Sequence, residues 1–154
     1  MKRYGNGYGN SKYGSSKVAF QGLVFDSKYE RDRYLYLLGL LREGKISGLR
    51  RQTKFLLIPK ATKIVSKQLK TKVKYVERVV EMQSLYHNDF TYLEDGKYIC
   101  EEFKSSMTSK LADYILRRKL MVQKIYNHNK KGHGQWIFRE VVYYNKKKTI
   151  ITDK

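Results

Sequence analysis

The chain has 154 residues, enough for one domain with a hydrophobic core and little more. Its 33 lysines and arginines far exceed its 14 aspartates and glutamates, which leaves a net charge of +19. Such a charge repels itself and favours a polyanionic partner, either nucleic acid or an anionic membrane. Because no apolar run is long enough to span a membrane, we expect nucleic acid and no membrane association.

The N-terminal segment differs in composition from the rest of the chain. Residues 1–16 contain glycine, tyrosine, asparagine and serine with scattered cations, and they show no hydrophobic period. We expect a flexible basic leader there and a single domain over 17–154. Interleaved tyrosines and cations can bind nucleic acid, although an inert leader fits equally well. No apolar segment follows the basic start, so we expect no signal peptide and an intracellular protein. The lone Cys100 predicts a buried, inert thiol.

The first elements have clear local signals. Residues 18–25 alternate around a Gln-Gly pair, which predicts a short hairpin. Ser27 and Glu30 have the spacing of a capping box, which predicts a helix that Gly44 ends. Glu30 lies one turn before the apolar face of this helix, and we therefore expect it at the edge of the core. That face comprises Tyr34, Leu37, Leu38 and Leu41.

The remaining elements alternate strands with a second helix. Strands are predicted over residues 52–58, 75–82, 85–93, 97–103 and 135–144. Glu94-Asp95-Gly96 is a strong tight-turn signal inside one hairpin. Residues 60–72 are a loop or a surface hairpin, and a lysine-rich tail follows the last strand. The second helix covers 109–126, with an apolar stripe of Leu111, Ile115, Val122 and Tyr126. The element order predicts an α/β fold with a mixed central sheet flanked by two helices.

Two acids and a lysine surround the predicted hairpin. Glu102 and Lys104 are two residues apart in a strand, so their side chains point to the same side, and hairpin pairing can bring Asp89 beside them. Two carboxylates on one face repel each other unless they share a cation, and oxygen ligands of this kind suit Mg²⁺ or Mn²⁺. The neighbouring ammonium can position water and stabilise developing negative charge.

This arrangement resembles the PD-(D/E)XK nuclease superfamily, whose motif is an acid, a hairpin and then acid-x-Lys. Asp89, Glu102 and Lys104 match the motif, and Glu30 fits the helix Glu that members often add. Asn88 departs from the proline of the motif name. The chain is similar to a family of small phage proteins of this superfamily, and to archaeal-type Holliday junction resolvases. The matching segments are KYGSSKVAFQGLVFDSKYE, GKISGLRRQTKFLLIP, NDFTYLEDGKY and EEFKS, with the basic helix around Arg117-Arg118-Lys119-Leu120.

The resemblance implies a restriction-endonuclease-like fold and a metal-dependent endonuclease. Asp89, Glu102 and Glu30 would hold Mg²⁺, with Mn²⁺ able to substitute, and Lys104 would position the nucleophile. It implies branched DNA as substrate, specifically Holliday junctions in phage recombination or genome processing, within the host cytoplasm. Two symmetric cleavage points favour a homodimer. The cations expected to contact DNA are Lys2, Arg3, Lys12, Lys17, Arg31, Arg50, Arg51, Arg117, Arg118 and Lys119.

Several alternatives remain open at this stage. Glu30 can be only the capping-box residue, and Asp89 can be a polar residue on an exposed face. Glu101 and Glu102 cannot both point inward from one strand, so one of them is expected to be solvated; the spacing to Lys104 favours Glu102 as the ligand. The rival functions are a flap or end-processing nuclease of the same chemistry and a non-catalytic nucleic-acid-binding protein.

Overall fold

The computed structural model describes residues 17–144 and 148–154, and they form two compact units that divide between Ser47 and Gly48. The predicted leader, residues 1–16, lies outside the described residues. No helix in the described ranges is long and apolar enough to cross a membrane.

The first unit contains the predicted hairpin and helix. Strands β1 (Val18–Phe20) and β2 (Leu23–Phe25) pair antiparallel. The two residues between them have positive φ angles of 49° and 76°, the backbone of a tight hairpin turn. Helix α1 (Lys28–Arg42) begins at Ser27, whose hydroxyl accepts a hydrogen bond from the Glu30 amide at 3.1 Å. Leu41, predicted on the apolar face, is 36% exposed, so the buried face is narrower than the pattern indicated.

A five-stranded sheet forms the centre of the second unit, in the order β11-β10-β9-β8-β3. Strands β9 and β10 are parallel, whereas β8 pairs antiparallel with β9 and β11 pairs antiparallel with β10. The α/β class with a mixed sheet is therefore confirmed. The bounds are β3 (Ile46–Arg51), β8 (Phe90–Glu94), β9 (Lys97–Ser105), β10 (Trp136–Tyr144) and β11 (Lys148–Asp153).

Two edge strands were absent from the predicted elements. The lysine-rich tail was predicted to follow the last strand, yet its residues 148–153 form β11. Residues 46–51 form β3, although glycine and two arginines give this segment no clear alternation. In both cases the neighbouring strand supplies backbone hydrogen bonds that a local pattern cannot reveal.

The hairpin before the predicted site differs from the expectation in one respect. A single strand over 85–93 was predicted, but the chain forms β7 (Ser84–His87) and β8 with a break at Asn88-Asp89. Strand β7 pairs with β4 (Lys54–Ile58), and β8 pairs with β9. The Asn88 side-chain amide donates to the Phe90 carbonyl, and such a local bond competes with continuous strand pairing. The two-residue turn at Asp95-Gly96 is confirmed by positive φ angles of 48° and 74°.

Helix α2 (Ala112–Lys130) follows a short 3₁₀ turn at Thr108–Lys110 and packs on the sheet. Its buried residues Met121 and Ile125 join Tyr86, Cys100 and Phe138 in a hydrophobic core. Cys100 is a free cysteine inside this core, which confirms the prediction that its thiol is buried. The predicted apolar stripe was correct only in part: Val122 packs against this core, whereas Tyr126 is 54% exposed. The stripe that faces the sheet begins instead at Tyr114 and is displaced around the helix.

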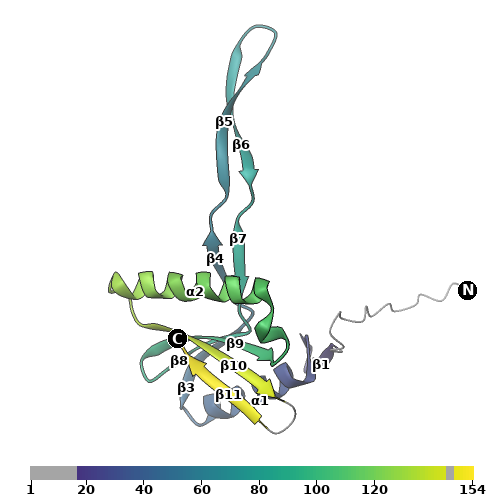
Figure 1. Ribbon diagram of the computed structural model, residues 1–154, viewed down its shortest axis with the longest axis vertical. Helices are drawn as coiled ribbons and strands as arrows, with labels where there is room; N and C mark the ends of the chain where they lie inside the picture. The colour runs from purple at the N-terminus through teal and green to yellow at the C-terminus, as the bar shows by residue number, and fades with distance from the viewer. Residues whose placement is uncertain (1–16, 145–147) are drawn as a thin grey trace, which may run out of the picture. The chain divides into compact units, whose positions relative to one another are not determined.

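Residues 60–72, predicted as a loop or a surface hairpin, form the first strand and the turn of a hairpin, and the strand predicted over 75–82 is its second strand. Strands β5 (Ala61–Gln68) and β6 (Val73–Glu81) pair antiparallel along their whole length. This hairpin continues beyond the β4–β7 pair and extends away from the sheet of the second unit (Figure 1). Residues 61–81 are called the arm below.

Candidate active site

Asp89, Glu102 and Lys104 lie together in the second unit. Glu102 and Lys104 alternate with Phe103 on β9, and their side chains share one face of the sheet. The Lys104 ammonium contacts Glu102 Oε1 and lies 3.8 Å from Asp89 Oδ2. Hairpin pairing therefore brings the first acid beside the acid-x-Lys pair, as the sequence predicted. The catalytic roles of the three residues stay predictions.

Asp89 is held in place by the break between β7 and β8. Its Oδ2 accepts a hydrogen bond from the Phe103 amide at 2.7 Å, which ties it to the strand of Glu102 and Lys104. Its side chain is 21% exposed, so it is not a residue of an open surface. A carboxylate anchored in this way presents its remaining lone pairs in a defined position.

Glu102 is buried although it is a carboxylate. It is only 4% exposed, and no group donates to its Oε2 in good geometry among the described residues, although the Tyr86 hydroxyl, also unpaired, interacts with this carboxyl. Burial, followed by the negative charge of Asp89, raises the pKa of Glu102 to about 7, although Lys104 and Tyr86 oppose this shift. A buried carboxylate oxygen without a donor is destabilising by itself and fits a position where a cation binds.

Lys104 remains charged between the two acids. Burial lowers its pKa, but Asp89 and Glu102 raise the pKa by more, and the net shift is upward. The side chain is 23% exposed, so the ammonium is held at the boundary between the sheet and solvent.

The raised pKa of Glu102 gives a prediction for stability. The folded-state pKa is about 7 and the ordinary value is 4.5, so the folded protein binds an additional proton between these pH values. The contribution of this group to stability therefore falls as the pH rises through that window. Glu102→Gln is expected to raise the free energy of unfolding at pH 8 by roughly 1–3 kcal/mol and to give no gain at pH 4. Urea unfolding at the two pH values tests this, and a destabilised variant at pH 8 would contradict it.

Glu101 lies on the opposite face of β9. It is fully buried and accepts a hydrogen bond from the Tyr92 hydroxyl at 2.6 Å. The expectation that either Glu101 or Glu102 would be solvated was wrong, because β9 lies inside the sheet and both of its faces are buried here. Only Glu102 shares its face with Asp89 and Lys104.

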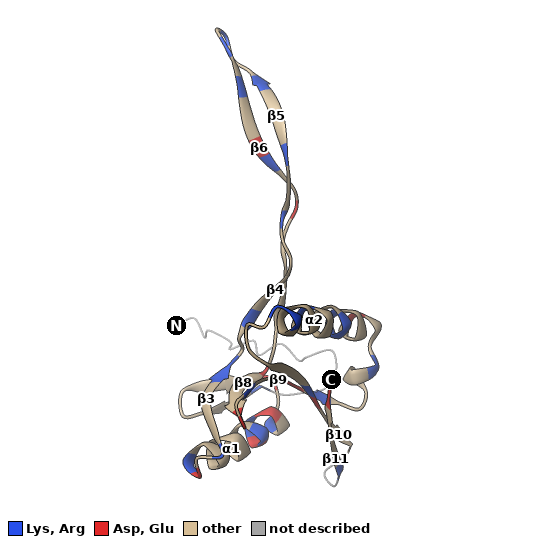
Figure 2. Cartoon of the chain, turned by 90° about the vertical axis from the view of Figure 1, so that its left-hand side faces the viewer, with Lys and Arg blue, Asp and Glu red and all other residues tan. Residues whose placement is uncertain are grey.

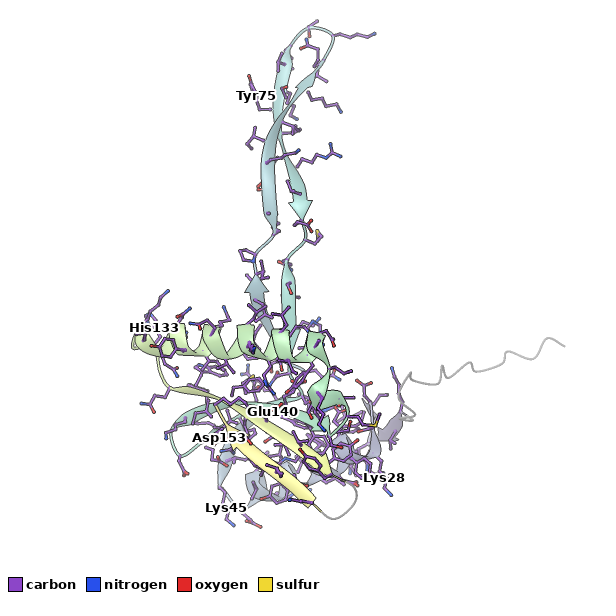
Figure 3. All side chains as sticks on the ribbon, viewed as in Figure 1. Lys28, Lys45, Tyr75, His133, Glu140 and Asp153 are labelled. Atoms are coloured by element: carbon purple, nitrogen blue, oxygen red, sulfur yellow. The ribbon has the colours of Figure 1, made fainter. Side chains whose placement is uncertain are left out.

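A third acid on this face, Glu140, was missed by the sequence-based prediction. Glu140 of β10 lies opposite Glu102 in the parallel register and is 6% exposed. It accepts hydrogen bonds from the Tyr114 hydroxyl at 2.8 Å, Arg118 at 2.7 Å and Lys154 at 2.6 Å. Burial raises the pKa of Glu140, but these three donors outweigh burial and lower it. Figure 3 labels Glu140 on the strand below α2.

Tyr114 connects the two acid–cation groups. Lys104 Nζ lies 5.4 Å from the centre of its ring, and Arg118 Cζ lies 5.6 Å from it. Cations near an aromatic ring are stabilised by its negative face. Arg118, one of the cations expected to contact DNA, is half-buried, because Glu140 and Tyr114 bind its guanidinium. The signal in the sequence was the Arg-Glu pair inside an otherwise apolar strand at 136–144.

Asp89 and Glu102 together fit a Mg²⁺ ion better than a metal that needs a full set of protein ligands. The described part of the chain has no cluster of three or more His, Cys, Asp or Glu side chains that could hold a metal. Mg²⁺ usually keeps several waters and binds through one or two carboxylates together with substrate phosphate. Asp89 and Glu102 supply that set, and Oε2 of Glu102 accepts no well-formed hydrogen bond from the described residues that would compete with a cation.

Glu30 belongs to α1 in the first unit. It is 5% exposed, and its Oε2 accepts a hydrogen bond from the Asp26 amide at 2.9 Å, one residue before the N-cap. Part of its carboxylate is thus used at the start of the helix, as a capping residue would be. Its predicted place in the metal shell stays a prediction.

The predicted DNA-binding cations have different surroundings. Lys2, Arg3 and Lys12 lie outside the described residues. Three of the others pair with acids: Lys17 with Asp26 at 3.9 Å, Arg31 with Asp32 at 2.6 Å and Arg117 with Asp113 at 3.3 Å. Arg118 binds Glu140, whereas Arg50 and Lys119 are exposed and Arg51 is half-buried. Figure 2 shows further lysines and arginines on α2 and on the arm.

Comparison with known proteins gives one match. Residues 10–145 match the model of a family described as "Protein of unknown function (DUF1064)". No curated protein and no solved structure matches the chain.

Proposed function

The chain belongs to this DUF1064 family, and we propose that it is a metal-dependent DNA endonuclease with a restriction-endonuclease-like arrangement. One observation carries the proposal: the buried carboxylate of Glu102 shares a sheet face with Asp89 and Lys104, and no group donates to its Oε2 in good hydrogen-bond geometry among the described residues. A structural ion pair alone does not account for that oxygen, because an unpaired buried acceptor reduces stability.

Each residue of the site would have a distinct role in phosphodiester hydrolysis. Asp89 and Glu102 would hold Mg²⁺, which polarises a phosphate oxygen and lowers the pKa of a water. Lys104 would donate hydrogen bonds to the attacking water and to the phosphate oxygens, where negative charge develops. The Phe103 amide keeps Asp89 oriented, and Tyr114 limits the positions open to the Lys104 ammonium. Glu30 would complete the metal shell.

The resemblance found in the sequence directs the proposal to branched DNA. We propose a Holliday junction as the preferred substrate, cleaved during phage recombination or genome processing. A four-way junction has two symmetric cleavage points, so a homodimer with one site in each subunit would suit it. A net charge of +19 supports binding to a polyanion of this size.

The proposal is tested with four labelled DNAs of equal length: a four-way junction, a flap, a linear duplex and a single strand. The full chain should cleave the junction in Mg²⁺ or Mn²⁺ and lose activity in EDTA. Preferred cleavage of the flap would favour the end-processing rival. Binding of all four DNAs without cleavage in either metal would instead identify a binding protein.

A further inference from the structure

The arm has two rows of side chains with different chemistry. In the register of β5 and β6, Lys63 lies opposite Arg78, and Lys67 lies opposite Lys74. Between these two cation pairs lies the pair of Val65 and Val76, on the same face. This face, called the cationic face below, consists of Lys63, Val65, Lys67, Lys74, Val76 and Arg78.

The cation pairs work against the stability of the arm. Like charges directly opposite each other on a strand pair are destabilising, by up to about 1 kcal/mol each. An isolated two-stranded hairpin is marginally stable at best, and β5 and β6 pair only with each other. A bound anion between these two repulsive pairs would offset their cost.

The other face of the arm offers no comparable charge. Ile64 and Tyr75 are 67% and 72% exposed there, and Tyr75 points away from the arm in Figure 3. The Thr62 hydroxyl donates to Glu77 at 2.6 Å, so the acid of this face is already hydrogen-bonded. Lys70 and Lys72 lie at the turn, where the Leu69 amide bonds the Lys72 carbonyl at 2.8 Å. The positive charge is thus concentrated on the cationic face and at the tip.

The dimensions of the cationic face match those of duplex DNA. Lys63 and Lys67 are four residues apart on one strand, a distance of about 13 Å at the usual rise of a strand. The major groove is about 12 Å wide and admits a two-stranded β-ribbon. A ribbon that crosses the groove would place one cation pair near the phosphates of each strand, with the two valines facing the groove between them.

We propose that the arm is a DNA clamp, and that its cationic face binds the phosphates on both sides of a major groove outside the cleavage site. This inference rests on the proposed function, because it takes the substrate to be duplex DNA or the duplex branches of a junction. The clamp would add affinity that does not depend on the metal site. It would also fix the orientation of a duplex branch relative to Asp89 and Glu102.

The first test neutralises the cationic face. The variant Lys63→Gln/Lys67→Gln/Lys74→Gln/Arg78→Gln is compared with Lys28→Gln/Arg42→Gln/Lys45→Gln/Lys148→Gln, which removes the same charge at exposed positions outside the arm. Binding to a 30-base-pair duplex and to a four-way junction is followed by fluorescence anisotropy over a range of salt concentrations. Four lost phosphate contacts should reduce the slope of log K against log[salt] by about 3–4 and weaken binding by roughly 10²–10³-fold. The control should keep the wild-type slope.

The outcomes separate the clamp from the proposed function. If the wild type binds neither DNA, the proposed function fails together with the clamp. If the wild type binds and cleaves, and the arm variant does so with the same salt slope, only the clamp fails. A wild-type dimer in sedimentation that becomes monomeric in the arm variant, with DNA binding unchanged, would identify a second copy of the chain as the partner of the arm.

A single substitution tests whether repulsion between Lys67 and Lys74 destabilises the free arm. Lys67→Glu replaces a repulsive pair with an attractive one opposite Lys74. Amide hydrogen exchange within residues 61–81 should become slower in the free protein, while affinity for duplex DNA falls. Exchange that becomes faster, or binding that stays unchanged, would overturn the view that these lysines are placed for an anion.

Discussion

Asp89→Asn and Glu102→Gln are each expected to reduce DNA cleavage by at least about 10³-fold, while the affinity for DNA stays the same or increases. Each substitution removes a proposed ligand of Mg²⁺, and the loss of several kcal/mol of transition-state stabilisation corresponds to a factor of this size. Each also removes a negative charge close to the position of a phosphate, which reduces repulsion. Single-turnover cleavage and anisotropy, measured on the same protein preparation, provide the two readouts.

Glu101→Gln is the matched control for these variants. Glu101 is the neighbouring acid on the same strand, it is also buried, and its hydrogen bond from Tyr92 can be accepted by an amide oxygen. It points to the face without Asp89 and Lys104, so this variant should retain cleavage. Equal losses in Glu101→Gln and Glu102→Gln would contradict the assignment of Glu102 as the ligand.

Misfolding can be separated from the loss of chemistry in the same series. Because Glu102→Gln is expected to be more stable than the wild type at pH 8, an inactive variant at that pH would be folded. Ca²⁺ in place of Mg²⁺ should allow binding without cleavage, since Ca²⁺ accepts a looser and larger ligand shell. Efficient cleavage in Ca²⁺, or a parallel loss of binding and activity in both variants, would rule out the proposed metal site.

Affinity for DNA is expected to fall by about 10³–10⁵-fold between 50 and 200 mM salt. This range corresponds to roughly 6–10 neutralised phosphates, and each contact releases counterions whose entropy depends on the salt concentration. The +19 charge and the exposed cations of the arm and of α2 provide enough positive groups for contacts of this number. Titrations at four salt concentrations with a non-cleavable condition, EDTA or Ca²⁺, measure the slope.

The variant with four glutamines on the cationic face separates the contribution of the arm to this salt dependence from that of the rest of the protein. The slope that remains after neutralising the cationic face reports the contacts made by the rest of the protein. A wild-type affinity that hardly changes with salt would show that binding does not depend on phosphate neutralisation. That result would argue against nucleic acid as the partner of the chain.

Local chemistry was sufficient to predict the hairpin that carries the candidate site. The Asp-Gly turn, which needs two residues with positive φ, sets the register of β8 and β9. Because side chains alternate along a strand, Glu102 and Lys104 must then share a face, and Asp89 at the start of the hairpin must lie near them. The capping residue Ser27 and the terminal Gly44 similarly define α1 without reference to the rest of the fold.

The tertiary structure alone decided which residues surround that hairpin. Glu140, Tyr114 and Arg118 come from β10 and α2, and only the parallel pairing of β9 with β10 places Glu140 beside Glu102. The hydrophobic pattern of one strand cannot predict which distant strand pairs with it in parallel, and here an entire helix separates the two strands in the sequence. Strand β9 is an inner strand of this sheet with both faces buried, which is why Glu101 is enclosed although alternation predicted that one of the two neighbouring acids would be solvated. The pKa of Glu102 also depends on this enclosure, because desolvation by distant elements is its largest cause.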